Sequence, residues 1–292
     1  MSELDFITKK ISESRKQRAG KYAKATAGIA VMVSMAVMAI LPAYSITYTA
    51  GYKYDSECGS GVAQLVYQEG ETTDDERIML QELCNGFLAS EDGYYRTRGY
   101  YPVKQYENWI RKLEIGYLHC VKPKYWMHYD SSGADICQVV IKCQDTDMRT
   151  VRQKEEAYRA EVERLVSKVE GKTVEEKVRY FHDYLVGCCE YDYSYTRSRP
   201  YDCLIDGTST CNGYAAAFYN LCSDAGLEAE YIVGIAETDD GARGFHAWNR
   251  VKSENGEWLY YDVTWDDVLE SYEYYGLTQE EMDRDHVIES VL

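Results

Sequence analysis

Two stretches of alternating apolar and polar residues meet at Asn255-Gly256, a pair typical of a β-hairpin turn. Between Phe245 and Trp265 the odd-numbered positions are largely apolar, and the even-numbered positions, which include His246 and Asp262, form the other face. The two apolar sets share one face only if paired residue numbers have an even sum, which requires a loop with an odd number of residues. We therefore predict a three-residue loop in which Gly256 is left-handed and forms a bulge. This register places His246 and Asp262 on the same face of neighbouring strands.

A helix that begins with a cysteine precedes the hairpin. Thr208-Ser209-Thr210 supplies its N-cap. The helix runs from Cys211 to about Ala225 and ends at Gly226. In the first turn, the free N–H groups and the positive end of the dipole favour a thiolate over a thiol. Cys222 lies on the same side of the helix but roughly 16 Å further along, so we assign it to the core.

A reactive thiolate needs a base, and the base needs a group that orients it. His246 and Asp262 meet this requirement if the hairpin directs both side chains toward Cys211. The alternative is an inert cysteine with an ordinary surface histidine and aspartate, which leaves their shared face without explanation. We therefore predict Cys211 as the nucleophile, His246 as the base and Asp262 as the orienting acid.

A glycine and three tryptophans near this triad are expected either to shape the site or to pack the structure around it. Gly213 is expected to leave room beside Cys211 for a substrate backbone. Trp248 and Trp258 either line the cleft on the face of the triad or pack at the sheet edge. Trp265-Asp266 is expected to close the strand.

A second histidine–aspartate pair, His182 and Asp183, lies on a predicted helix over 174–187. Thr173 and Glu176 form a capping box that opens this helix. Because the apolar residues of the helix follow one stripe, we predict a packed helix and a structural hydrogen bond between His182 and Asp183 rather than a catalytic pair.

The order of three motifs resembles the transglutaminase-like superfamily of papain-type cysteine enzymes: CNGYAAAFYNLCSDAG, then GFHAWNRV, then WLYYDVTWDD. The segments KVRYFHDYL and YYGLTQEEMDRDH are also similar to the bacterial form of this domain, so the resemblance covers about 150–292. It implies an α+β, papain-like fold, in which a helix bearing the cysteine packs on an antiparallel sheet bearing histidine and aspartate. It also assigns the nucleophile to Cys211, the base to His246 and the orienting acid to Asp262.

Two features of the wider superfamily have no counterpart in this sequence. The tryptophan found upstream of the nucleophile in animal transglutaminases is absent between 127 and 247, and Ile205 stands where papain-type enzymes carry an oxyanion glutamine. The backbone N–H of Cys211 is the expected oxyanion donor, and the second donor is not identified. Animal transglutaminases use calcium, but the sequence has no EF-hand-like loop and Asp239-Asp240 is interpreted as a turn. No metal site and no organic cofactor are predicted.

The resemblance implies acyl transfer or hydrolysis at amide bonds of proteins or peptides, with an amine or water as the acceptor. One alternative is a catalytically silent domain that binds peptides or cell-wall polymers. Another is a secreted binding protein stabilised by disulfides, in which Cys211 is oxidised.

A run of apolar residues near the N-terminus, 27–43, contains no charged residue. Residues 1–45 carry seven Lys/Arg and three Asp/Glu, a net charge of +4. An uncharged run of this length behind basic residues predicts a single membrane span with the N-terminus inside the cell. The alternatives are a signal peptide cleaved at Ala43-Tyr44-Ser45 and a buried core helix.

The predicted organisation has four segments. These are a basic cytoplasmic segment at 1–26, a transmembrane signal-anchor at 27–45, an extracytoplasmic accessory α/β region at 46–147 and a transglutaminase-like domain at 148–292. Residues 46–292 carry 25 Lys/Arg and 46 Asp/Glu, a net charge of −21. This charge repels nucleic acid and weakly favours a cationic amine as acceptor.

The accessory region is predicted to contain helices over 74–90 and 106–113 and a strand over 135–143. A further helix is expected at about 152–170. Five cysteines could form disulfides outside the cytosol, with a pairing that spacing does not define. They are Cys58, Cys84, Cys120, Cys137 and Cys143.

Overall fold

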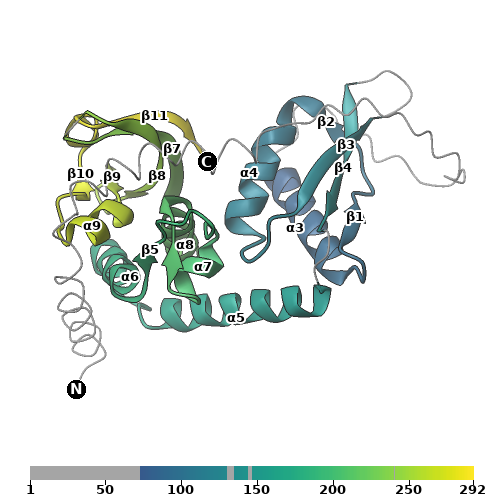
Figure 1. Cartoon of the computed structure of the whole chain (residues 1–292), viewed down its shortest axis with the longest axis horizontal. Helices are drawn as coiled ribbons and strands as arrows, with labels where there is room; N and C mark the ends of the chain where they lie inside the picture. The colour runs from purple at the N-terminus through teal and green to yellow at the C-terminus, as the bar shows by residue number, and fades with distance from the viewer. Residues whose placement is uncertain (1–72, 130–134, 144–146, 240) are drawn as a thin grey trace, which may run out of the picture.

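The computed structural model describes residues 73–129, 135–143, 147–239 and 241–292. Figure 1 shows two lobes side by side, with α5 (Met148–Ser167) running along both. The predicted anchor at 27–45 lies outside the described residues. None of the helices in the described ranges combines the length and apolarity that a bilayer span needs.

The accessory lobe is a small antiparallel sheet covered by helices. Its central strand β4 (Ile136–Lys142) pairs with β3 (Lys124–Tyr129) along one edge. The other edge pairs with two short strands, β1 (Tyr94–Arg96) and β2 (Tyr101–Pro102). The helical elements of this lobe are α3 (Thr73–Ala89), η1 (Val103–Gln105) and α4 (Tyr106–Gly116).

Three predictions for this lobe are confirmed, because the structure has helices close to 74–90 and 106–113 and a strand close to 135–143. Apolar side chains of α3, α4 and β4 form its core. They include Leu83, Phe87, Trp109, Leu113, Val139 and Ile141. Cys84, Cys120 and Cys137 are free thiols in the structure, and Cys58 lies outside the described residues.

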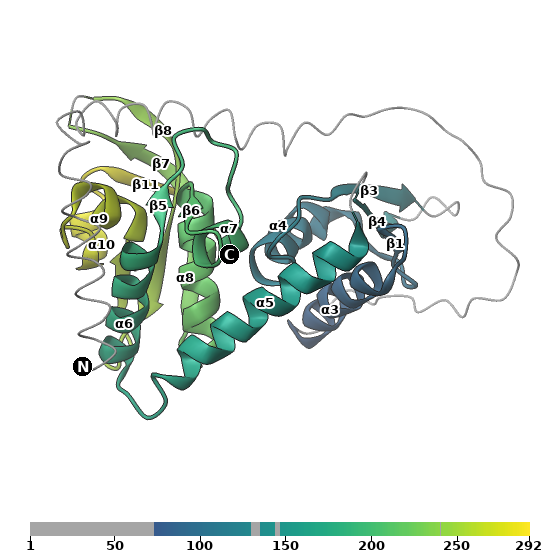
Figure 2. The same ribbon diagram turned by 60° about the horizontal axis from the view of Figure 1, so that its bottom comes forward.

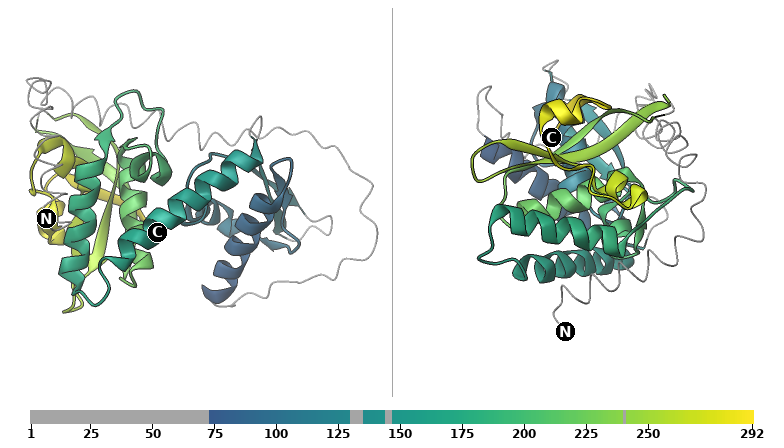
Figure 3. Two further views of the ribbon diagram at one scale, coloured as in Figure 1. Left: turned by 90° about the horizontal axis from the view of Figure 1, so that it is seen from below. Right: turned by 90° about the vertical axis from the view of Figure 1, so that its left-hand side faces the viewer.

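The second lobe contains a five-stranded antiparallel sheet. In spatial order its strands are β10 (Tyr275–Leu277), β9 (Trp258–Tyr261), β8 (Arg243–Lys252), β7 (Ala229–Glu237) and β11 (His286–Val291). The longer helices are α6 (Val174–Cys188) and α8 (Cys211–Asp224), and the short ones are α7 (Pro200–Leu204), α9 (Val263–Leu269) and α10 (Gln279–Met282). The right-hand view of Figure 3 shows the strands lying over the helices. This arrangement agrees with the mixed α/β fold expected from the sequence.

The main core lies among α5, α6 and α8, which contribute large side chains with almost no exposed surface. Examples are Tyr158, Leu165, Phe181, Leu185, Phe218 and Leu221. The capping box predicted for α6 is present, because Thr173 accepts a hydrogen bond from the Glu176 backbone and Glu176 binds the Thr173 backbone in return. Figure 2 shows α5 continuing from this core to the accessory lobe, so one helix belongs to both.

The register of the β8–β9 hairpin is the predicted one. Val251 pairs with Leu259, and Arg250 pairs with Tyr260, so paired residue numbers have an even sum. Ser253 N–H donates to Glu257 O, which leaves a three-residue loop, and Gly256 has φ +85°. The left-handed glycine is the bulge that an odd loop needs.

One local prediction beside the hairpin is wrong, and one at the cysteine helix is confirmed only in part. The strand does not continue through Trp265-Asp266, because Asp262 caps a helix and α9 begins at Val263. The N-cap of α8 lies within the predicted Thr208-Ser209-Thr210 segment, but Thr208-Ser209 forms strand β6, which pairs in parallel with β5 (Glu190–Tyr191). Thr210 is the N-cap residue, and its hydroxyl makes no capping hydrogen bond.

Candidate active site

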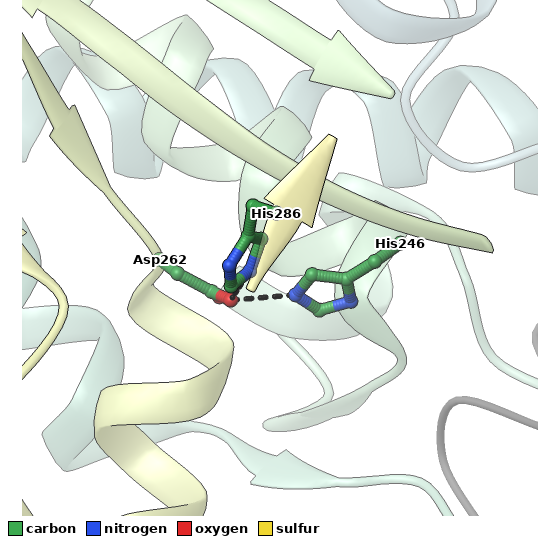
Figure 4. Close-up of side chains that lie close together, drawn as sticks. All are labelled: His246, Asp262 and His286. Atoms are coloured by element: carbon green, nitrogen blue, oxygen red, sulfur yellow. Dashed lines mark hydrogen bonds and ion pairs between the residues drawn. The ribbon is translucent and has the colours of Figure 1, made fainter. Parts of the chain in front are cut away.

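The side chains of His246 and Asp262 are in direct contact. His246 Nε2 lies 2.6 Å from Asp262 Oδ2, as Figure 4 shows, at the separation of a charge-assisted hydrogen bond. His246 comes from β8, and Asp262 directly follows β9. The odd loop of the hairpin therefore brings the two residues together, as the sequence predicts.

Both oxygens of the Asp262 carboxylate are fully engaged. Oδ1 accepts the backbone N–H groups of Thr264 (3.0 Å) and Trp265 (3.1 Å). Oδ2 faces His246 at 2.6 Å and His286 Nε2 at 3.3 Å. Burial raises the pKa of Asp262, but the charges and hydrogen bonds of His246 and then His286 outweigh it and hold the pKa well below its usual range. The carboxylate is therefore ionised at neutral pH.

Cys211 lies near the His246 ring, close enough to affect its pKa. Burial lowers the pKa of His246, but the charge and hydrogen bond of Asp262, followed by those of Cys211, raise it from 6.5 to about 10. Because Nε2 is bonded to Asp262, Nδ1 is the ring nitrogen left for the thiol. The structure thus brings His246 against Asp262 and places Cys211 near the same imidazole.

Sequence reasoning did not identify His286, the third side chain in this cluster. It lies at the start of β11 and is 1% exposed. The motif YYGLTQEEMDRDH contains it, but nothing in the local spacing shows that β11 pairs with β7 and so returns His286 to Asp262. This contact could be found only from the topology of the sheet.

His246, Asp262 and His286 each offer an atom within 4.8 Å of the others, which is close enough to consider a metal ion. Two ligands about 2.0–2.1 Å from a tetrahedral ion lie about 3.3 Å apart. The His246–Asp262 separation of 2.6 Å is shorter and is that of a hydrogen bond. The residues present therefore fit a hydrogen-bond network better than a metal centre.

Residues 160–263 match the family model described as the transglutaminase-like superfamily. The match places a transglutaminase-like domain at these residues. Its matched range contains Cys211, His246 and Asp262. No match was found among curated proteins.

Three solved structures are similar to this chain at low identity. A protein described as a TGase is 14% identical, with 48% of this chain and 44% of that chain covered and a TM-score of 0.32. A candidate cysteine protease from Cytophaga hutchinsonii is 15% identical, with 59% and 67% covered and a TM-score of 0.35. A candidate protease from Parabacteroides distasonis is 11% identical, with 49% and 36% covered and a TM-score of 0.26. The chain spans less than half the length of the first and third of these proteins.

The side chains of the candidate nucleophile and base are almost completely buried. Cys211 is 2% exposed and His246 is 5% exposed. Tyr195, in the segment before α7, lies near the sulfur, since burial and then the charge of Cys211 raise its pKa. The backbone of Tyr195 is left-handed, with φ 57°, a conformation that costs a non-glycine residue energy.

The segment that carries Tyr195 is held by one carboxylate. Asp192 accepts hydrogen bonds from the backbone N–H groups of Ser194, Thr196 and Arg197, each 2.9 Å long. The carbonyl of Arg197 in turn accepts from Thr210 N–H at 2.9 Å, next to Cys211. This segment is therefore an ordered loop attached to the start of α8.

The expectation for Gly213 is corrected by the structure. A Cβ at Gly213 would lie 2.6 Å from the carbonyl oxygen of Arg199 and would also overlap the hydroxyl of Ser209. The glycine is needed because the protein's own chain packs there, so it does not leave room for a substrate.

The two tryptophans proposed for the cleft have packing roles. Trp248 is 1% exposed and packs with Tyr260 and Met282, with its ring 6.0 Å from the ring of His246. Trp258 carries the guanidinium of Arg250 over its face at 4.7 Å. Both residues therefore pack within the sheet, but the predicted edge position is wrong, because β8 and β9 are inner strands.

The second histidine–aspartate pair links two helices. His182 Nδ1 contacts Asp183 and His182 Nε2 contacts Asp266, both at 3.0 Å, and His182 has no exposed surface. The predicted hydrogen bond to Asp183 is confirmed. Asp266 belongs to α9, so the His182–Asp266 contact fixes α6 against α9, the helix that Asp262 caps. Cys222 is also fully buried, as predicted for a core residue.

A cavity of about 380 Å³ lies apart from the transglutaminase-like site, in the accessory lobe beside α5. Its lining contains four lysines: Lys122, Lys124, Lys142 and Lys154. None of Cys211, His246, Asp262 and His286 contributes to it. The catalytic hypothesis therefore does not depend on this cavity.

Proposed function

We propose that the protein is a cysteine enzyme that transfers or hydrolyses acyl groups at amide bonds of proteins or peptides. Cys211 is the nucleophile, His246 the proton carrier and Asp262 the orienting acid. The observation that carries this proposal is the imidazole of His246, bonded to Asp262 at 2.6 Å and close enough to Cys211 for the thiol to affect its pKa. A nucleophile, a base and an orienting acid in that order are the components of a catalytic triad.

The first half of the reaction forms a thioester. The Cys211 sulfur attacks the amide carbonyl carbon, and the tetrahedral intermediate then breaks its C–N bond. The His246 imidazolium gives its proton to the leaving amine, while the Asp262 carboxylate stabilises the imidazolium before this step. Cys211 N–H, in the first turn of α8, is the proposed oxyanion donor.

The second half releases the acyl group. An amine or a water molecule loses its proton to neutral His246 and attacks the thioester carbon, and the C–S bond breaks. An amine acceptor gives a crosslink, and water gives deamidation or peptide cleavage. The net charge of −21 in residues 46–292 weakly favours a cationic amine.

The test is capture of the acyl-enzyme on the full chain. The protein is incubated with a library of peptides, and thioester adducts are located by mass spectrometry. We expect an adduct at Cys211, none on a Cys211→Ala variant and an unchanged adduct on Cys222→Ala. Turnover by Cys211→Ala would refute the nucleophile, and peptide binding without any adduct would favour a catalytically silent domain.

We also propose that the enzyme is tethered to the cell membrane, with the N-terminus inside and the transglutaminase-like domain outside. The uncharged run at 27–43 and the basic residues before it support this proposal. The full chain should stay in the membrane fraction when membranes are washed with alkaline carbonate. It should also be cut by protease added outside the cell. A variant without residues 27–43 should lose both properties, and a mature chain beginning after Ser45 would favour a cleaved signal peptide.

A further inference from the structure

We propose that His286 is a positioning residue of this site, which holds the Asp262 carboxylate against His246 by a hydrogen bond from the last strand of the sheet. This inference rests on the proposed function, because positioning matters only if His246 and Asp262 act on Cys211. It adds a residue from outside the family match, which ends at 263.

The first argument is the shared oxygen. His286 Nε2 lies 3.3 Å from the same Oδ2 of Asp262 that His246 Nε2 approaches to 2.6 Å. A carboxylate oxygen can only accept, so each imidazole presents an N–H to it. With two more N–H groups on Oδ1, the carboxylate cannot rotate without breaking hydrogen bonds.

The second argument is that His286 is itself rigidly held. Its ring packs between Trp265 and Trp248, with ring centroids 4.6 and 4.9 Å away. Its Nδ1 lies 2.5 Å from Asp285 Oδ1, and the hydroxyl of Tyr274 donates to Asp285 Oδ2 at 2.7 Å. A group fixed on both sides in this way can fix the residue that it binds.

The third argument concerns the backbone beneath the ring. His286 pairs with Ala236 of β7, and the carbonyl of Asp285 accepts from Glu237 N–H at 2.8 Å. The neighbouring strand β8 carries His246. The two histidines therefore project from strands on either side of β7 toward one carboxylate, as Figure 4 shows.

The contact also divides the charge of Asp262 between two imidazoles. The titratable groups that surround His286 are Asp262, His246, Asp285 and Tyr274. If the donor at 286 is removed, the carboxylate acts on His246 alone. We therefore expect a more persistent imidazolium at alkaline pH, together with slower chemistry because the carboxylate is less well fixed.

The experiment measures the alkylation of Cys211 in the full chain as a function of pH, with iodoacetate and iodoacetamide. The anionic reagent reacts preferentially while His246 is an imidazolium, so the ratio of the two rates reports its charge. His286→Leu should lower the maximal rate roughly tenfold or more and move the alkaline fall of the ratio to higher pH. His286→Gln, whose amide can donate from a position close to Nε2, should restore most of the rate and the wild-type profile.

Two further variants separate positioning from folding. His119→Leu removes another buried imidazole, which lies outside the site and contacts the Glu155 carboxylate at 2.8 Å. This variant should lower stability without changing the pH profile of Cys211 alkylation. Asp285→Asn keeps His286 but weakens its second contact, and should change rate and profile in the direction of His286→Leu, to a smaller extent. It provides the measurement if His286→Leu fails to fold.

The outcomes distinguish this inference from the proposed function. If wild-type Cys211 is not selectively alkylated, the proposed function fails. If Cys211 is selectively alkylated and either His286→Leu keeps the wild-type rate and profile or His286→Gln is as impaired as His286→Leu, only the positioning role of His286 is refuted.

Discussion

A single carboxylate connects the chemistry of this site to its local structure. Asp262 caps α9 with one oxygen and contacts two imidazoles with the other. The charge that supports His246 and the hydrogen bonds that begin a helix therefore come from one side chain. Substitutions can separate the two functions, because asparagine also caps helices well but carries no charge.

Asp262→Asn should lower the rate of Cys211 acylation about 10²- to 10⁴-fold, because the neutral amide no longer stabilises the His246 imidazolium. The loss of stability from the cap should be small. Asp262→Ala should show the same kinetic loss and an additional destabilisation of about 1 kcal/mol, because the cap is also lost. Acylation kinetics and urea unfolding measure the two effects, and wild-type kinetics in Asp262→Asn would argue against an orienting acid.

The raised pKa of His246 predicts a pH dependence of stability. The folded protein keeps this proton up to a pH of about 10, whereas the unfolded chain releases it near 6.5. The contribution of protonated His246 to the free energy of unfolding is therefore complete below pH 6.5 and is lost as the pH rises to about 10. Over this interval the free energy of unfolding should fall by up to about 1.4 kcal/mol per pH unit.

A His246→Gln variant is the control for this dependence. Between these pH values its free energy of unfolding should fall less than that of the wild type, because the part due to His246 is missing. Urea denaturation at a series of pH values measures both curves. Parallel curves for wild type and variant would mean that His246 is not held as an imidazolium.

At the scale of elements, the sequence predicts what depends on local periodicity. The parity of the β8–β9 pairing, the left-handed Gly256 and the start of α8 at Cys211 all follow from patterns within a few residues. The start of α9 was missed because alternation continues through Trp265, while the capping hydrogen bonds of Asp262 override it. The contact of His286 was missed for a different reason: it depends on β11 pairing with β7, which no local pattern specifies.

The helix that Asp262 opens ends at Glu270 in the left-handed conformation, with φ 52°. This position usually favours glycine, because a side chain is strained there. Glu270→Gly should therefore stabilise the protein by about 0.5–1 kcal/mol, measured by thermal or urea unfolding. Glu270→Ala, which keeps the strain, is the matched control, and a glycine variant less stable than the alanine variant would contradict the interpretation.

At the scale of the whole molecule, the accessory lobe contacts α8, the helix that carries the proposed nucleophile. Asn220 of α8 donates to the carbonyl of Ile115 at 3.0 Å and to the hydroxyl of Tyr158 at 2.9 Å. Arg199, just before α7, contacts Glu114 of the accessory lobe at 3.2 Å. Because these contacts lie close to α8, the orientation of this helix depends on residues outside the family match.

Asn220→Leu should destabilise the protein by about 1–3 kcal/mol, because the Ile115 carbonyl and the Tyr158 hydroxyl lose their buried partner. Gln153→Ala, on the exposed side of α5, should change stability by less than about 0.5 kcal/mol. Urea unfolding of both variants measures the difference. Equal stability would show that the bridge between the lobes contributes nothing to folding.

The central claim, that Cys211 is activated by His246 despite its burial, is tested by the rate of iodoacetamide modification at pH 6, located residue by residue with mass spectrometry. The account predicts that Cys211 reacts far faster than the fully buried Cys222, and that His246→Ala abolishes the difference. Equal rates at the two cysteines, or a Cys211 rate unaffected by the loss of His246, would contradict it.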